Sequence, residues 1–149
     1  PYILVAHSFG GLNVRLYASK YPEEVAGIIL VDVTHENQDI ALLSDLPENI
    51  QKMYKEQFTR EGTYEDFIES CNQVRASRDT IKDIPLIVLS ADQHGFPEEL
   101  EKRWTELQEE LASLSHNSKH IAVKNISHYI HIDNPKLVIE SIKDMIDKK

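Results

Sequence analysis

The chain has 149 residues, a length that fits one domain with a substantial core. Its hydrophobic fraction of 41% and charged fraction of 28% are typical of a soluble globular protein. A formal net charge of −9, with no cluster among the 16 lysine and arginine residues, argues against nucleic-acid binding, which needs a basic patch.

Cysteine usage and hydropathy indicate the cellular compartment and whether the chain could cross a membrane. Cys71 is the only cysteine, so the chain cannot form an internal disulfide or a paired-cysteine metal site, and a reducing, cytoplasmic location is favoured. No apolar run approaches the roughly 20 residues that cross a bilayer, and no signal segment opens the chain. The sequence begins at Pro1, inside a predicted strand and without an initiator methionine, so we expect that an N-terminal portion is missing.

The chain opens with a predicted strand, a sharp turn and a helix. Residues 2–6 form an apolar run typical of a buried strand, and residues 9–20 carry apolar side chains at helical spacing. Ser8 lies at the junction with almost no loop on either side. Such a reversal forces strained backbone and close contacts, so it needs small neighbours. The sequence supplies them at Ala6, Gly10 and Gly11.

The remainder alternates between strands and helices. A second apolar strand is predicted over about residues 26–31 and ends at Asp32. Polar, helix-forming sequence follows over residues 36–78, where Pro47 and Gly62 divide it into about three short helices. The apolar side chains of this insertion either face a ligand or pack on the domain beneath.

Three further elements complete the pattern. Residues 86–89 predict a buried strand, and an amphipathic helix follows over residues 98–114. A fourth strand is predicted over residues 120–126, and the last helix begins at Pro135 with Asp133 or Asn134 as its N-cap. Apolar strands that alternate with helices indicate a parallel sheet that is covered on both faces.

The segment AHSFGG, residues 6–11, carries a family resemblance. It is similar to the G-x-S-x-G nucleophile elbow on a strand–turn–helix, and the chain resembles the α/β-hydrolase superfamily from that elbow onward. Ala6 stands where the family usually has glycine, which changes the turn geometry mildly. The resemblance implies that residues 1–149 are the C-terminal part of a single α/β-hydrolase domain. It implies a helical cap at residues 36–78, and the four predicted strands are fewer than the usual eight.

Polar residues follow each predicted strand, where the carboxyl ends of a parallel sheet gather ligands and catalytic groups. Ser8 follows the first strand, Asp32 the second, Asp92 the third and His128 the fourth. The order serine, aspartate, histidine is the chain order of the α/β-hydrolase triad. A serine hydroxyl is a poor nucleophile at neutral pH, so Ser8 needs a base, and an imidazole suits that role.

The base is assigned through the segment NISHYIHIDNP, which resembles the histidine loop of the family and places the role on His128. His131, three residues on, is the alternative, although we expect it to orient the loop or pack on the last helix. His116 and His120 are spaced like metal ligands, but they lie on a predicted polar turn without a cysteine or carboxylate partner. We expect both to be solvated, and we predict no metal site and no cofactor.

Two aspartates compete for the role of the triad acid. In most of the family the acid follows the strand that ends here at residues 86–89, and that position aligns best with His94, with Asp92 two residues early. Some members place the acid at the end of the preceding strand, where Asp32 lies. We favour Asp32, although an aspartate that merely caps a turn would also fit there, and Asp92 stays the alternative.

The oxyanion of an acyl-transfer intermediate needs fixed hydrogen-bond donors. The resemblance implies that one is the backbone N–H of Phe9, the residue after the nucleophile. The other comes in this family from a loop after an earlier strand, which this sequence does not contain. His7, beside the nucleophile, is expected to pack and not to take part in the chemistry.

Taken together, the resemblance implies a serine hydrolase that cleaves a small carboxylic ester or similar acyl compound through an acyl-enzyme on Ser8. A member that uses the same triad on another bond is equally compatible with the sequence. A ligand-binding or receptor protein on the same fold is the alternative from another class. The chain as isolated could also be inert, and the sequence does not address the oligomeric state.

Overall fold

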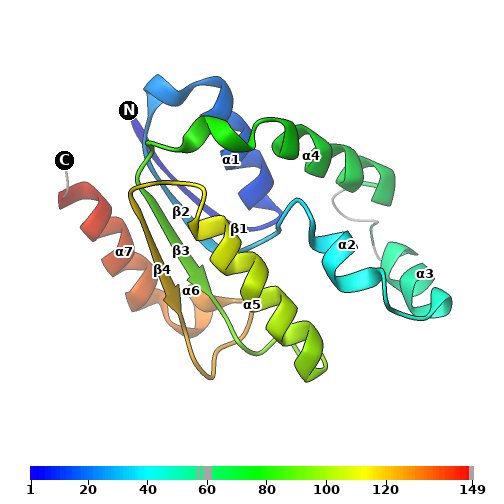
Figure 1. Ribbon diagram of the computed structural model, residues 1–149. Helices are drawn as coiled ribbons and strands as arrows, with labels where there is room; N and C mark the ends of the chain where they lie inside the picture. The colour runs from blue at the N-terminus through cyan, green and yellow to red at the C-terminus, as the bar shows by residue number, and fades with distance from the viewer. Residues whose placement is uncertain (57, 59–61, 148–149) are drawn as a thin grey trace.

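The computed structural model describes residues 1–56, 58 and 62–147. Within these residues, four parallel strands form one sheet in the order β1-β2-β3-β4 (Figure 1). The strands are β1 (Tyr2–Ser8), β2 (Val25–Val33), β3 (Leu86–Ser90) and β4 (Ser118–Ala122). Because the strands are parallel, their carboxyl ends meet at one edge of the sheet.

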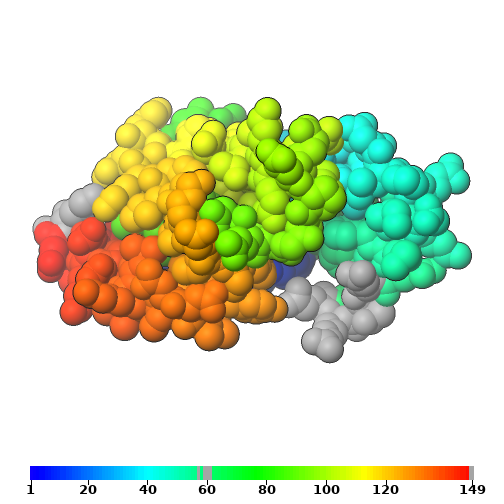
Figure 2. Space-filling model, turned by 90° about the horizontal axis from the view of Figure 1, so that it is seen from below, coloured from blue at the N-terminus to red at the C-terminus, as the bar shows by residue number. Residues whose placement is uncertain are grey.

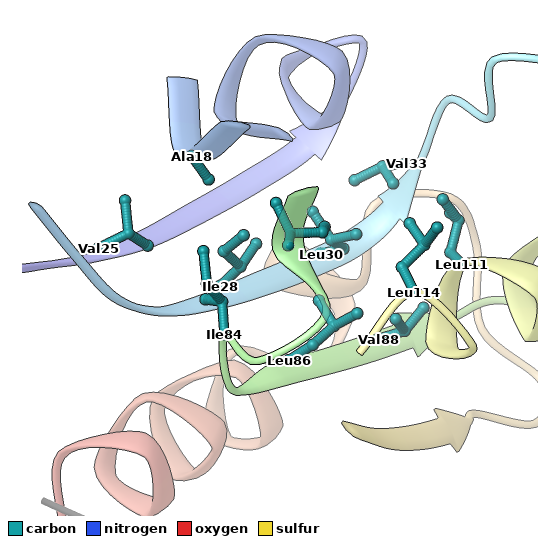
Figure 3. Close-up of a cluster of buried hydrophobic side chains, with 11 residues drawn as sticks. Ala18, Val25, Ile28, Leu30, Val33, Ile84, Leu86, Val88, Leu111 and Leu114 are labelled. Atoms are coloured by element: carbon teal, nitrogen blue, oxygen red, sulfur yellow. The ribbon is translucent and has the colours of Figure 1, made fainter. Parts of the chain in front are cut away.

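Helices α1 (Gly10–Lys20) and α5 (Glu98–Ala112), with the short η2 (Arg78–Ile81), cover one face of the sheet. Ile28 and Leu30 of β2 point into this layer and are fully buried (Figure 3). Leu111 and Leu114 pack on them from α5 and the turn after it. The amphipathic stripe predicted over residues 98–114 is therefore the face that covers the sheet.

The opposite face is covered by α6 (Ile130–Asp133) and α7 (Pro135–Asp147). Ile29 and Val31, the alternate residues of β2, are buried here, which confirms that β2 is covered on both sides. The N-terminus of α7 forms as predicted, because the Asn134 side chain accepts a hydrogen bond from the N–H of Leu137 at 3.2 Å and Pro135 begins the helix.

The insertion between β2 and β3 folds into α2 (Gln38–Leu43), α3 (Glu48–Glu56) and α4 (Tyr64–Ala76). Helix α4 packs on α1, where Phe67 and Cys71 are buried against Leu12. Helices α2 and α3 extend beyond the carboxyl edge of the sheet (Figure 1).

The fourth strand differs from the prediction. It spans Ser118–Ala122 instead of residues 120–126, and residues 123–129 form a loop. The pairing of β4 with β3 ends at Ala122, and Asn125 adopts a φ of 57°, outside the extended range of regular strand backbone. His120 therefore lies within the strand and not on a turn, and its ring accepts or donates a hydrogen bond with Ser90 Oγ at 2.8 Å.

A buried group of charges joins the first helix to the insertion. Arg15 Nη1 of α1 forms an ion pair with Glu36 Oε2 at 2.8 Å, and Arg78 of η2 contacts the other oxygen of the same carboxylate. Both Arg15 and Glu36 are almost completely buried. His35 beside them accepts a hydrogen bond at Nδ1 from the N–H of Asn37 at 3.0 Å, and burial lowers the pKa of its imidazole.

Among the residues described, none of the helices combines the length and the hydropathy that a bilayer crossing requires. A short η1 (Pro22–Glu24) connects α1 to β2.

Candidate active site

Ser8 ends β1 in a strained conformation. Its φ of 54° is left-handed, which non-glycine residues rarely adopt. Its carbonyl accepts a hydrogen bond from the N–H of Thr34 at 3.0 Å, which ties the turn to the end of β2. A Cβ added at Gly10 would lie 3.7 Å from that of Ala6, an ordinary contact, so the methyl group of Ala6 is accommodated within this turn.

Phe9 follows Ser8 directly and is the N-cap residue of α1. Its backbone N–H therefore lies at the positive end of a helix dipole, a favourable position for a developing negative charge.

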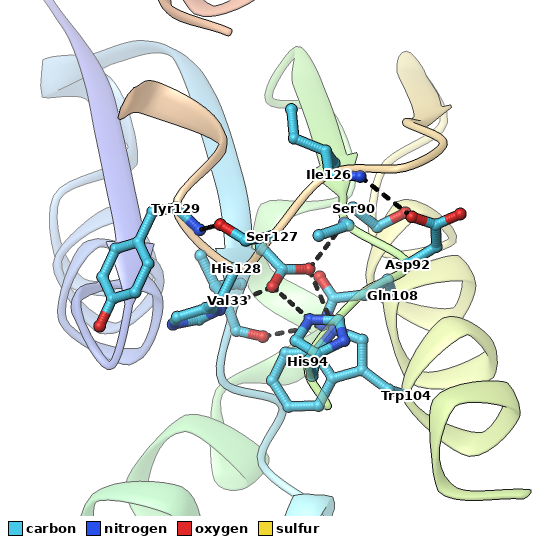
Figure 4. Close-up of polar contacts among 12 residues, drawn as sticks. Val33, Ser90, Asp92, His94, Trp104, Gln108, Ile126, Ser127, His128 and Tyr129 are labelled. Carbon is cyan, nitrogen blue, oxygen red and sulfur yellow. Dashed lines mark hydrogen bonds and ion pairs between the residues drawn. The ribbon is translucent and has the colours of Figure 1, made fainter. Parts of the chain in front are cut away.

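Asp32 is completely buried at the end of β2, with a φ of 47°. Its Oδ1 accepts hydrogen bonds from the N–H of Ala91 at 2.9 Å and from Trp104 Nε1 at 3.0 Å. Its Oδ2 lies 2.7 Å from His128 Nδ1 and 2.7 Å from His94 Nε2 (Figure 4). One carboxylate thus has four hydrogen-bond partners.

These hydrogen bonds keep the carboxylate ionised. Burial on its own would raise the pKa of Asp32, but the hydrogen bonds from His128 and His94 outweigh burial and hold the pKa below its usual range. An ionised carboxylate accepts the Nδ1–H of a neutral imidazole and leaves Nε2 of that ring free to accept another proton.

His128 lies in the loop between β4 and α6. His7 of β1 contributes to holding this loop, because its Nε2–H donates a hydrogen bond to the carbonyl of His128 at 2.9 Å. The two rings are 4.4 Å apart between centroids. Burial lowers the pKa of His7, which favours the neutral ring at pH 7. His7 therefore packs against the loop, as expected, and also hydrogen-bonds to it.

Ser8 and His128 line the same cavity, of about 420 Å³, at the carboxyl edge of the sheet. Trp104, Phe96 and Tyr129 contribute aromatic surface to it. Figure 2 looks onto this edge and shows a small blue area of the N-terminal segment, recessed between the orange segment and the yellow-green α5.

A second, apolar cavity of about 450 Å³ lies between the insertion and the start of α5. Phe96 lines both cavities. The other lining residues are Leu42, Leu43, Leu46, Ile50, Met53, Tyr54 and Leu100. The aromatic residues of the insertion therefore do not all face the same way. Tyr54 lines this cavity, whereas Phe67 is buried against α1.

The structure separates the remaining predicted candidates from this centre. Asp92 Oδ1 accepts the N–H of Ile126 at 3.2 Å, and its Oδ2 lies 4.0 Å from Lys124 Nζ. His131 is exposed and its ring lies 4.5 Å from that of His7. His116 is exposed, but its Nδ1 lies 3.3 Å from Asp83 Oδ1, so the prediction that it has no carboxylate partner is wrong.

Three residues at the centre were not assigned a role from the sequence: His94, Glu101 and Trp104. The sequence aligns His94 with the usual position of the acid and indicates no other role for it. The i to i+3 spacing of Glu101 and Trp104 places both on one side of α5, but nothing in the sequence indicates that this side meets Asp32.

Asp32, His94 and His128 each offer one possible metal ligand, and these atoms lie within 4.8 Å of one another. Two imidazoles and a carboxylate are a ligand set that zinc accepts. However, both ring nitrogens already approach the same oxygen at hydrogen-bond distance. We therefore interpret the cluster as a hydrogen-bonded network and assign no metal to it.

The chain is similar to known proteins along its length. A family model described as alpha/beta hydrolase fold matches residues 1–83. The uncharacterized protein YqjL of Bacillus subtilis (strain 168) is 32% identical over 145 residues, which are 97% of this chain and 56% of that protein.

Two solved structures share the fold. Alpha/beta hydrolase domain-containing protein 10 from mouse has a TM-score of 0.63 at 20% identity, over 99% of this chain and 62% of that one. A structure of the metagenome-derived lipolytic enzymes LipS and LipT has a TM-score of 0.61 at 15% identity, over 99% of this chain and 65% of that one. The chain thus spans less than two thirds of the length of each of these proteins.

Proposed function

The chain belongs to the α/β-hydrolase fold family, and on that premise we propose that the full-length protein is a serine hydrolase that cleaves a carboxylic ester or similar acyl compound. The observation that carries the proposal is the 2.7 Å contact between His128 Nδ1 and Asp32 Oδ2, at a cavity that His128 lines together with Ser8. A nucleophile, a base and an acid that orients the base are the parts that acyl transfer requires.

In this proposal the Ser8 hydroxyl attacks the acyl carbon while His128 Nε2 accepts its proton. The Nδ1–H of the resulting imidazolium remains hydrogen-bonded to Asp32, which stabilises its charge. The intermediate carries a negative oxygen, and the N–H of Phe9 is a donor for it. His128 then returns the proton to the leaving alcohol as the C–O bond breaks, and an acyl group stays on Ser8.

Water completes the cycle by the same steps. It attacks the acyl-enzyme while His128 Nε2 takes a proton, and the acid product leaves as the proton returns to the Ser8 oxygen. No redox partner is needed, because hydrolysis only exchanges an ester bond for an acid and an alcohol.

The apolar cavity that adjoins the site through Phe96 favours a substrate with an apolar group. Burial of such a group on Leu42 and Met53 would bind the substrate through the hydrophobic effect. A lipolytic activity, as in LipS and LipT, agrees with this feature.

Hydrolysis of p-nitrophenyl esters by the full-length protein tests the proposal. We expect turnover of esters with short to medium acyl chains, and a loss of about 10⁴-fold or more in Ser8→Ala, because nucleophile and base act as a unit. Retention of more than a tenth of the activity in Ser8→Ala would remove the nucleophile assignment. A protein that binds an ester analogue but turns over no ester would instead favour a binding function.

A further inference from the structure

Asp32 Oδ2 faces two imidazoles. His94 Nε2 lies 2.7 Å from this oxygen, the same distance as His128 Nδ1 (Figure 4). The proposed reaction uses His128 and gives His94 no part, although the His94 side chain is only 5% exposed and touches the acid directly. A buried imidazole at this position calls for a physical explanation.

The second nitrogen of the His94 ring also faces a carboxylate. His94 Nδ1 lies 2.7 Å from Glu101 Oε2. Glu101 Oε1 in turn accepts the backbone N–H groups of His94 at 2.8 Å and Phe96 at 3.1 Å. The backbone of the loop that carries His94 therefore fixes the Glu101 carboxylate, and this carboxylate in turn holds the His94 ring.

Both ring nitrogens must carry protons to make these contacts. Ionised carboxylates only accept hydrogen bonds, and an imidazole with two N–H groups is a cation. Burial alone would lower the pKa of His94, but the hydrogen bonds to Asp32 and Glu101 outweigh it and raise the pKa above its ordinary value. For the carboxyl of Glu101 the effects are reversed: burial would raise its pKa, but the hydrogen bonds from His94 outweigh burial and hold the pKa below its usual value.

A cation at this place acts on the proposed base. The rings of His94 and His128 are 5.9 Å apart between centroids, and both draw on the same carboxylate oxygen. A positive His94 disfavours a second positive ring beside it. The other titratable groups that face the two rings are Asp32 of β2, Glu101 of α5, His7 of β1 and Tyr129 of the loop.

We propose that His94, held by Glu101, is a positioning residue that sets the acid limit of activity by sharing the carboxylate of Asp32 with the base. The inference rests on the proposed serine hydrolase function. It assigns His94 two effects: it fixes Oδ2 toward His128, and its charge extends the pH range in which the base accepts a proton. The residue touches neither the substrate nor the reacting atoms.

The variant His94→Gln separates charge from hydrogen bonding. Glutamine can still donate an amide N–H toward Asp32, but it cannot become a cation. The test is to measure kcat and KM for ester hydrolysis from pH 5 to 9 in the full-length protein and in this variant. The acid limb of the profile should move up by about one pH unit. Plateau activity should stay within about tenfold of the original, and KM should change little.

His120→Gln is the matched control. It also removes a half-buried imidazole with a hydrogen bond, to Ser90 Oγ at 2.8 Å, but this ring belongs to β4 and is not one of the four hydrogen-bond partners of Asp32. Its pH profile should not move.

A second measurement does not depend on turnover. The ring signals of His94, followed by NMR, should titrate above the ordinary imidazole value of about 6.5. In Glu101→Gln the midpoint should fall by about one pH unit, since one carboxylate partner has lost its charge. This variant keeps the proposal testable if His94→Gln does not fold.

Two results would overturn the proposal. The first is an active His94→Gln variant whose acid limb stays in place, even if its activity falls by the same factor at every pH. The second is a His94 ring that titrates below the ordinary imidazole range. Absence of turnover by the unaltered protein at every pH would instead overturn the proposed function, and this inference with it, so the two failures are distinguishable.

Discussion

Asp32 and Asp92 end neighbouring strands but meet different partners. Asp32 approaches the ring of His128 at 2.7 Å, whereas Asp92 accepts a backbone N–H from Ile126 at 3.2 Å. If Asp32 orients the imidazole and stabilises its cation, Asp32→Asn should lower kcat by about 10² to 10⁴-fold with KM nearly unchanged. Asp92→Asn should lose less than about tenfold.

Steady-state kinetics on both aspartate variants checks this order, with circular dichroism to show that each variant folds. If Asp92→Asn lost more activity than Asp32→Asn, the role of the acid would belong to Asp92. Asp32 at the end of β2 would then have only a structural role.

At the scale of single residues, the sequence allowed Ser8, Asp32 and His128 to be placed at one sheet edge. The ends of parallel strands meet there whatever the details of packing. The contacts of His94 and Trp104 with Asp32 could not be predicted in the same way. They span 62 and 72 residues of sequence and depend on how α5 packs on the sheet.

At the scale of elements, the contact between α1 and β2 depends on Gly11. A Cβ added at this position would lie 2.4 Å from Cβ of Val33, which is closer than real atoms approach. Gly11→Ala should therefore shift α1 and destabilise the fold by about 1–3 kcal/mol. Gly10→Ala is the control, because its added Cβ would lie 3.7 Å from Ala6, an ordinary contact.

Urea unfolding of the two glycine variants measures this difference. Gly10→Ala should change the free energy of unfolding by less than about 1 kcal/mol, since alanine also favours the helix. Equal free energies for both variants would show that α1 moves away from Val33 at no cost.

The boundaries of elements could be predicted where burial is complete. Strands β2 and β3 are buried on both faces, so their sequences are apolar as far as Val31 and Leu89. Strand β4 is at the edge of the sheet within the described residues, and none of its five residues is fully buried. Its apolar pattern is therefore weak, and the sequence has no clear signal for the end of its pairing at Ala122 or for the left-handed φ of Asn125.

At the scale of the whole molecule, Glu36 joins α1 to the insertion through its two arginine partners. Glu36→Gln would leave Arg15 buried, at 2% exposure, opposite a neutral group. Loss of one partner of a buried ion pair costs about 3–5 kcal/mol. We therefore expect Glu36→Gln to lower the free energy of unfolding by about 3 kcal/mol at pH 7.

The same carboxylate predicts a pH dependence of stability. Burial would raise the pKa of Glu36, but the hydrogen bond and charge of Arg15 outweigh it and lower the pKa from 4.5 to about 2. A lowered folded-state pKa stabilises the protein fully above the unfolded value, and this contribution is lost as the pH falls from 4.5 toward 2. The difference between the unaltered protein and Glu36→Gln should shrink across that window. A difference that stays constant from pH 7 to pH 3 would contradict this account.

The central claim is that Ser8 is a nucleophile which His128 activates, and mapping a fluorophosphonate adduct on the full-length protein tests it most directly. The serine oxygen displaces fluoride and forms a stable bond to phosphorus, so the adduct records the attack itself. We predict one adduct, on the peptide that contains Ser8, absent in Ser8→Ala, strongly slowed in His128→Ala and formed at close to the original rate in His131→Ala. An adduct on another residue, or ester hydrolysis without any adduct on Ser8, would contradict the account.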